Sequence, residues 1–138
     1  MSDRASSTCE AACVRLCLDF ANGIDSYDNE RVADVFAPDA VFDHVAGRFE
    51  GREGVLRMLA SRPADMVTRH MCTNIEVKAT GQTTASGRCY AAVFRATSKD
   101  GKLPLPPVTP LFVEYHDEYG LIDGRWYITH RKTVPVFT

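Results

Sequence analysis

An aspartate and a histidine, far apart in the sequence, have the chemistry of an acid–base pair. His70 stands in the stretch TRHMCTNIEV (68–77), where a strand pattern begins, and Asp25 stands in GID (23–25), at the end of a helical pattern. A histidine has an ordinary pKa of about 6.5, so it can exchange a proton at neutral pH. A carboxylate bonded to one ring nitrogen fixes the tautomer and leaves the other nitrogen free to take a proton from a substrate carbon.

Proton abstraction of this kind serves several reactions. Beside a leaving group it gives elimination, and beside a carbonyl group it gives isomerisation or an aldol-type cyclisation. The pair therefore indicates acid–base chemistry on carbon without selecting one of these reactions.

Both residues also have a purely structural interpretation. His70 can be a strand-end histidine bonded to a nearby carbonyl group, and its local sequence alone favours that role. Asp25 can cap the helix that follows it, although Ser26, Asp28 and Asn29 are better placed for this. That leaves Asp25 available for pairing with a histidine.

Strand alternation supplies further candidate pocket residues. Phe42 and His44 share one face of the run AVFDHV (40–45). On the last predicted strand, His130 shares a face with Trp126. Each of the two histidines is as consistent with a pocket wall as with a rim position near solvent.

Two aromatic residues and an arginine lie on one predicted strand. Tyr90 and Phe94 share a face of GRCYAAVFRATS (87–98), and we include them as candidate substrate-binding residues. Aromatic residues in such positions are more often sheet core than ligand wall. Arg95 is more consistent with a surface charge beside Lys99 than with a substrate clamp.

Helical patterns occupy the first part of the chain. Apolar spacing predicts a helix over residues 7–22, with Gly23 as its C-cap. A second helix is capped by Asp28 or Asn29 and ended by Pro38. After the short strand over 40–45, the sequence predicts a turn and a short helix that stops at Pro63.

The C-terminal half consists of β-rich runs, separated by breakers, over residues 70–80, 87–98, 109–122 and 125–137. The Asp-Gly pair at 123–124 predicts a hairpin, and the four prolines between 104 and 110 predict a stiff loop, one that would lie over a pocket mouth. Helices followed by strands predict an α+β domain, with helices on one face of an antiparallel sheet. We expect a single domain over 1–138, with 1–7 as a flexible lead-in.

Composition excludes several classes of function. The net charge of −2 argues against binding to nucleic acid or to an anionic membrane surface, and no apolar run is long enough to cross a bilayer. An odd number of cysteines, five, without an export signal predicts reduced thiols in the cytoplasm. Cys9, Cys13 and Cys17 recur every four residues, which favours a buried helix stripe over a metal site. No motif predicts a metal or a cofactor.

The order of these elements resembles the SnoaL-like branch of the nuclear-transport-factor-2-like (NTF2-like) superfamily. The resemblance rests on GID, DVFAPDAVFDH, GREGV, TRHMCTNIEV and DGRWYITHR, and it extends from Ser7 to Phe137. It implies a cone-shaped, cystatin-like α+β fold, in which N-terminal helices and a curved antiparallel sheet enclose a pocket. Members include polyketide cyclases, scytalone dehydratase, hexachlorocyclohexane dehydrochlorinase, steroid isomerases and the small subunit of ring-hydroxylating dioxygenases.

The resemblance also assigns roles to residues. Dehydratase and dehydrochlorinase members carry an Asp–His dyad, and Asp25 and His70 stand at the matching places. Dehydrochlorinase-like members place an arginine on the last strand; counting from the strand tryptophan, His130 stands there in this chain. The face that bears Phe42 would look into the cone. Members commonly form homodimers or homotrimers, so the resemblance implies a homo-oligomer.

Two functions are therefore expected. The first is a cofactor-independent dehydratase, dehydrohalogenase, isomerase or cyclase acting on a small hydrophobic, aromatic or polycyclic molecule through Asp25 and His70. The second is a non-catalytic small-molecule-binding or assembly subunit like the dioxygenase small subunit. A catalytic protein requires the two side chains within hydrogen-bond reach of each other at an empty cavity, whereas an assembly subunit predicts a filled one.

Overall fold

A long N-terminal helix packed on a curved sheet dominates the structure. The computed structural model describes the backbone of residues 3–138 and the side chains of residues 8–138. Within the predicted lead-in, residues 1 and 2 lie outside the described residues, and residues 3–7 already belong to the first helix. The elements, in chain order, are α1 (Asp3–Asp25), α2 (Asn29–Asp34), β1 (Phe36–His44), β2 (Gly47–Glu50), α3 (Gly51–Ala60), β3 (Met66–Ala79), β4 (Thr84–Thr97), β5 (Leu111–Ile122) and β6 (Arg125–Phe137).

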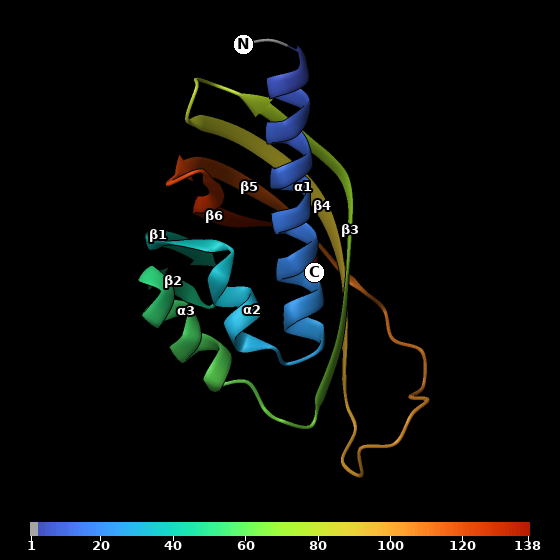
Figure 1. Cartoon of the computed structure of the whole chain (residues 1–138). Helices are drawn as coiled ribbons and strands as arrows, with labels where there is room; N and C mark the ends of the chain where they lie inside the picture. The colour runs from blue at the N-terminus through green and yellow to red at the C-terminus, as the bar shows by residue number, and fades with distance from the viewer. Residues whose placement is uncertain (1–2) are drawn as a thin grey trace.

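The strands form one sheet in the order β2-β1-β6-β5-β4-β3. All neighbours are antiparallel except β1 and β6, which are parallel. The sheet curves around α1, which runs along its inner face beside β3, while α2 and α3 lie at the β1–β2 end (Figure 1). The predicted α+β architecture is confirmed, although the sequence predicted a turn where β2 lies.

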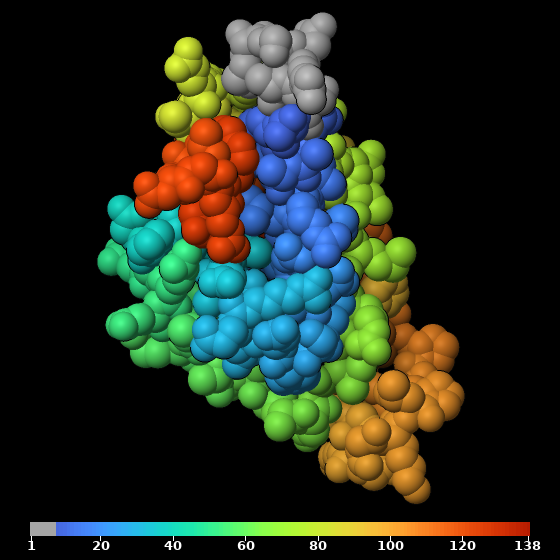
Figure 2. Space-filling model, in the orientation of Figure 1, coloured from blue at the N-terminus to red at the C-terminus, as the bar shows by residue number. Residues whose placement is uncertain are grey.

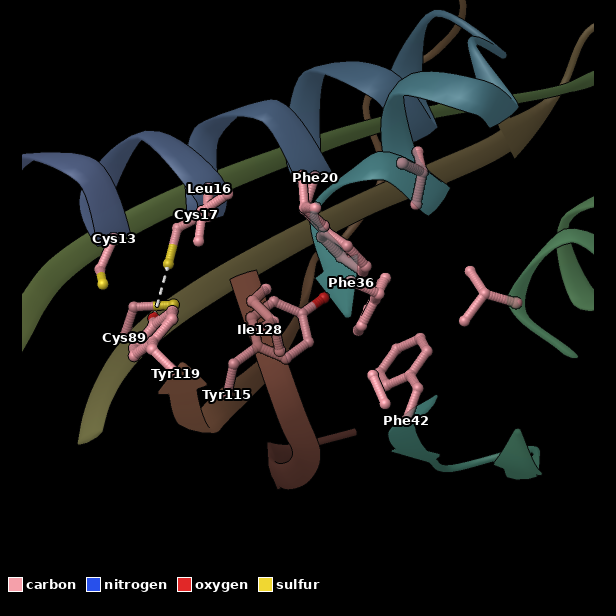
Figure 3. Close-up of a cluster of buried hydrophobic side chains, with 14 of the residues drawn as sticks. Cys13, Leu16, Cys17, Phe20, Phe36, Phe42, Cys89, Tyr115, Tyr119 and Ile128 are labelled. Carbon is pink, nitrogen blue, oxygen red and sulfur yellow. Dashed lines mark hydrogen bonds between the residues drawn. The ribbon is translucent and has the colours of Figure 1, made fainter. Parts of the chain in front are cut away.

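The core forms where α1 faces the sheet. Its cysteine stripe is buried as predicted, and the thiols of Cys13 and Cys17 point toward the side chains of β4 and β5 (Figure 3). One turn further along, the ring of Phe20 meets the rings of Phe36, Phe42 and Tyr115 edge-on, with centroids 5.6–6.0 Å apart. Edge-to-face packing is a favourable arrangement for aromatic rings, so these contacts fix the helix over the sheet.

A fully buried ion pair joins β5 to β6 under the helix. The guanidinium of Arg131 donates from Nε and Nη2 to the two carboxylate oxygens of Asp117, each at 2.8 Å. It also packs against the rings of Phe20 and Tyr115, whose centroids lie 4.5 and 4.2 Å from the guanidinium carbon. Tyr119 donates its hydroxyl proton to the same carboxylate. The bidentate geometry and the ring contacts compensate two charges that would otherwise be costly to bury.

Helix α1 ends three residues later than the sequence predicted, and Gly23 is not its C-cap. Tyr27 takes the left-handed conformation with φ of 59°, and the N–H of Asp28 bonds to the carbonyl of Gly23 at 2.9 Å. This is a Schellman-type ending built on a tyrosine instead of a glycine. Gly23 is required for a different reason, since a Cβ there would lie 2.7 Å from Cγ2 of Val32 on α2.

The remaining boundaries shift by a few residues. The second helix is capped by Asp28 as predicted but ends before Pro38, which lies inside β1. The hairpin between β5 and β6 is confirmed, because Asp123 and Gly124 both have positive φ, as a type I′ turn requires. The proline-rich loop projects from the body of the molecule (Figure 2) and borders a groove on the outer side of β3 and β4 instead of covering the inner cavity. Among the described residues, no helix is long and apolar enough to cross a bilayer.

The close approach of α1 to α2 generates a stability prediction. Gly23→Ala should lower the free energy of unfolding by about 1–3 kcal/mol, because the new methyl group collides with buried Val32. Gly54→Ala in α3 is the matched control: its Cβ would meet neighbouring atoms only at 3.4 Å or more, so the better helix former should leave stability unchanged or raise it by up to about 1 kcal/mol. Urea unfolding measures both. Equal effects of the two substitutions would contradict the packing argument.

Candidate functional site

A cavity of about 300 Å³ opens at the end of α1, between the helices and the inner face of the sheet. Most of its wall is apolar and comes from α1, β1, α3 and β4: Phe20, Ile24, Phe42, Met58, Leu59 and Val93. The titratable or hydroxyl-bearing side chains of the wall are Tyr115, His44, Ser61, Arg62, Thr68, His70 and Arg95. An apolar pocket with a few converging polar groups is the usual form of a small-molecule site.

Asp25 and His70 meet at this cavity. Oδ1 of Asp25 lies 2.7 Å from Nδ1 of His70, and Oδ2 accepts the backbone N–H of the same histidine at 2.8 Å. The side chains are 15% and 10% exposed, respectively. The last residue of α1 thus holds both the backbone and the ring of a residue in β3, so the ring has one orientation.

Thr68 and Arg62 support the carboxylate. The Thr68 hydroxyl donates to Oδ1 of Asp25 at 3.0 Å. Arg62 in turn donates to the hydroxyl oxygen of Thr68 at 3.2 Å and to the carbonyl of Ile24 at 2.9 Å, and it stacks on the ring of Tyr27. The sequence predicted neither residue, because the loop after α3 brings Arg62 to the end of α1 only in the folded chain.

The environment of Asp25 determines the tautomer of His70. Burial disfavours the charged carboxylate and by itself would raise the pKa of Asp25. Hydrogen bonds from the ring and backbone of His70 and from the Thr68 hydroxyl, together with the charge of the His70 ring, outweigh burial, so the pKa of Asp25 is lowered. An ionised carboxylate only accepts hydrogen bonds, so Nδ1 of a neutral His70 carries the proton. Nε2 is then the unprotonated nitrogen, and it has no hydrogen-bond partner among the described residues.

His44 has the opposite arrangement. It lines the cavity beside Phe42, as strand alternation predicted, and its Nδ1 accepts the backbone N–H of Ala46 at 3.2 Å. Burial lowers the pKa of His44, and the charge of the His70 ring when that ring is protonated and the charge of Arg95 lower it further, so the His44 ring is neutral at pH 7. With Nδ1 accepting, the single proton of the neutral ring lies on Nε2. The cavity therefore holds one histidine that accepts through Nε2 and one that donates through it.

The prediction that His130 lines the pocket is wrong, because a β-bulge interrupts β6. The ladder with β5 pairs Tyr119 with Ile128 and Glu118 with His130, so Thr129 is an extra residue. A bulge reverses the alternation of side chains beyond it.

The bulge turns the next residue inward. Arg131 is fully buried against the core, whereas His130 faces away from the cavity and its Nε2 lies 2.7 Å from Oδ2 of Asp43. The basic residue on the inner side of the last strand is thus Arg131, which the sequence pattern did not single out. That guanidinium lies behind Phe20 and Tyr115 and does not border the cavity.

Tyr90 and Phe94 do not line the cavity either. Alternation along β4 points both to the outer face of the sheet, where Tyr90 is 40% exposed and Phe94 borders the outer groove. Val93 and Arg95 of the same strand point inward instead. The sequence showed the alternation but not which of the two faces was buried, since both carry an aromatic or aliphatic residue.

No metal cluster accompanies the site. Within the described part of the chain, no group of three or more His, Cys, Asp or Glu side chains is arranged to hold a metal ion. The five cysteines are free thiols, and Cys9, Cys13, Cys17 and Cys89 are buried in the core.

Comparison with known proteins agrees with this fold. A family model described as a SnoaL-like domain matches residues 5–132. Hexachlorocyclohexane dehydrochlorinase (LinA) type 2 has 22% sequence identity and a TM-score of 0.82, with 99% of this chain and 92% of that chain covered. A protein provisionally named scytalone dehydratase from Novosphingobium aromaticivorans has 21% identity and a TM-score of 0.79, with 92% and 83% covered.

A third structure supplies the name of the fold. A protein of unknown function with a cystatin-like fold from Nostoc punctiforme has 19% identity and a TM-score of 0.75, with 91% of this chain and 90% of that chain covered. At such identities the likeness shows the fold, and the predicted cystatin-like architecture is confirmed. Among curated proteins, no sequence matches the chain at a significant level.

The lowered pKa of Asp25 predicts a pH-dependent contribution to stability. A carboxylate with a depressed folded-state pKa stabilises the fold above its ordinary pKa of about 3.9, and the contribution is lost as pH falls through the folded-state value. Asp25→Asn should therefore lower the free energy of unfolding by about 1–3 kcal/mol at pH 7, where charge-assisted hydrogen bonds are lost. The deficit should shrink as pH falls below about 4.

The control for this comparison is Asp39→Asn, which changes an exposed aspartate of β1. Denaturant unfolding at pH 7 and near pH 3 measures all three proteins. A deficit for Asp25→Asn that is the same at both pH values would mean that the charge of Asp25 does not stabilise the fold.

Proposed function

The chain belongs to the SnoaL-like family, and from this premise we propose that it is a cofactor-independent acid–base enzyme of the dehydratase, dehydrohalogenase, isomerase or cyclase type. Its substrate is a small hydrophobic molecule of aromatic or polycyclic form. The observation that carries the proposal is the 2.7 Å contact between Asp25 and His70 at the wall of an apolar cavity of about 300 Å³. A filled cavity would have favoured the assembly subunit.

In this proposal His70 is the general base. Its Nε2 lone pair accepts a proton from a substrate carbon, and the ring becomes an imidazolium whose positive charge Asp25 stabilises through Nδ1–H. The backbone N–H of His70 and the hydroxyl of Thr68 keep the carboxylate oxygens in place. The base therefore has its orientation before substrate enters, which avoids the cost of ordering it during the reaction.

His44 is the electrophilic partner in this proposal. A neutral ring that is protonated on Nε2 donates a hydrogen bond to an oxygen that gains negative charge, such as an enolate oxygen or a leaving hydroxyl group. Two titratable groups whose surroundings give them different protonation patterns are typical of acid–base sites. The elimination, isomerisation and cyclisation variants all use the same two histidines.

We also infer that the protein forms a homodimer or homotrimer through the outer face of the sheet. Met71, Ala92, Phe112 and Phe137 stand in one cross-strand row over β3, β4, β5 and β6. Met71 is 56% exposed and Phe137 is 67% exposed, so an apolar row faces outward. Met71 is therefore not part of the core.

The oligomer is tested by light scattering on the eluting peak of a gel-filtration column. The wild type should have a mass of two or three chains, and Phe112→Glu should shift it to one chain, because a buried, unpaired charge is costly at an apolar interface. Glu118→Gln, a polar change elsewhere on β5, is the control. A monomeric wild type at high micromolar concentration would contradict the inference.

Proton abstraction itself can be tested without knowing the substrate. In deuterated water, the base removes a C2 proton from 1-tetralone to give the enolate, and a solvent deuteron returns to carbon. The wild type should accelerate this exchange, and His70→Ala should lower the rate by about 10²–10⁴-fold while the circular dichroism spectrum is unchanged. Proton NMR measures the exchange.

His116→Ala is the matched control, since His116 contacts Glu114 on β5 and lies outside the cavity wall. It should exchange the ketone at the wild-type rate. Undiminished exchange by His70→Ala would remove His70 from the proposed role. No acceleration by the wild type over buffer, with a panel of aromatic ketones, would favour the non-catalytic binding or assembly subunit.

A further inference from the structure

One positive charge at the cavity has no counterpart in the protein. Arg95, an exposed arginine of β4, borders both the inner cavity and the groove under the proline-rich loop, so it stands at the solvent-accessible edge, or mouth, of the cavity. Among the described residues it makes no ion pair and no hydrogen bond. Its guanidinium is nevertheless close enough to His44 to contribute to the lowered pKa of that ring.

The other charged groups of the site have hydrogen-bond partners within the protein. The Asp25 carboxylate accepts hydrogen bonds from His70 and Thr68, and the Arg62 guanidinium is held by Thr68 and the carbonyl of Ile24. Asp25 is negative and Arg62 is positive, so these two charges balance each other at the dyad. No aspartate or glutamate borders the cavity to neutralise Arg95. The site as a whole therefore carries one excess positive charge at its entrance.

The sheet fixes the distance between this charge and the proposed base. Arg95 is the cross-strand partner of Thr68, and His70 pairs with Val93, so Arg95 and His70 are diagonal neighbours on the same face. Such neighbours lie about 7–8 Å apart, with their Cβ atoms somewhat closer. A group bound by Arg95 and a carbon placed at His70 therefore belong to different parts of one small molecule.

We propose that the substrate is a carboxylic acid with an apolar body, and that Arg95 binds its carboxylate at the mouth while the body fills the cavity. The inference rests on the proposed function, because it names the substrate class of that same site. A guanidinium binds a carboxylate through two parallel hydrogen bonds, which orients the ligand as well as attracting it. Phe42, Val93 and Met58 supply the apolar wall for the body, and the carbon that loses its proton lies several bonds from the carboxylate.

The test compares two probes of nearly equal shape, 2-naphthoate and its neutral amide, 2-naphthamide. Isothermal titration should show that the wild type binds the carboxylate about tenfold more tightly than the amide, as expected for a charge-assisted contact at a partly exposed arginine. Arg95→Gln should abolish the preference, and Arg95→Lys should keep part of it, because the charge remains while the two-pronged geometry is lost. The unfolding midpoint of each variant checks that the fold is intact.

Arg69→Gln is the matched control. Arg69 is an exposed arginine of β3 that borders the outer groove but not the inner cavity, so its loss should leave the tenfold preference unchanged. His70→Ala should also keep the preference, which separates carboxylate binding from proton abstraction. A wild type that binds both probes equally, a preference that survives in Arg95→Gln, or a preference that is lost in Arg69→Gln or His70→Ala would overturn the inference. None of these results depends on whether the protein turns over a substrate.

Discussion

The organisation of the site depends on the hydrogen bonds that Asp25 accepts from both the ring and the backbone of His70. They connect the last residue of α1 to the fifth residue of β3, which lies 45 positions later in the sequence. The helix reaches that place because the close α1–α2 contact at Gly23 and the left-handed Tyr27 turn the chain sharply after it. The end of α1, the start of β3 and the orientation of the His70 ring therefore depend on one another, so a change in any one of them alters the other two.

The back of the cavity depends on a second constraint, the buried pair of Arg131 and Asp117. The guanidinium of Arg131 packs against the rings of Phe20 and Tyr115, which form part of the cavity wall, so an ionic contact in the core positions apolar surface at the site. A β-bulge at Thr129 is what turns Arg131 inward. Two carboxylates thus serve two purposes: Asp117 stabilises a cation in the core, and Asp25 orients a neutral ring at the cavity.

The sequence was sufficient where a local pattern carried the information. It predicted the α+β order, the cysteine stripe, the Asp-Gly hairpin, and the closeness of Asp25 and His70, the last by resemblance to a known family. It failed where the decisive feature appears only on folding. The bulge in β6 reversed the direction of the His130 side chain. The curvature of the sheet decided which face of β4 lines the cavity, and the loop after α3 brought Arg62 to the dyad. Tyr90 and Phe94 were wrongly predicted for the same reason, since alternation alone does not identify the inner face.

The proton positions on the two rings can be measured in the free protein: in its neutral form His70 carries its proton on Nδ1, and neutral His44 carries its proton on Nε2. Nitrogen-15 NMR of the imidazole rings, assigned with His70→Gln and His44→Gln variants, distinguishes the two tautomers through the shifts of the protonated and unprotonated nitrogens. The predicted result is that the neutral forms of the two rings have opposite tautomers, with the Nδ1 proton of His70 shifted by its bond to Asp25. A His70 ring that carries its proton on Nε2 would contradict the account, because no lone pair would then face the cavity.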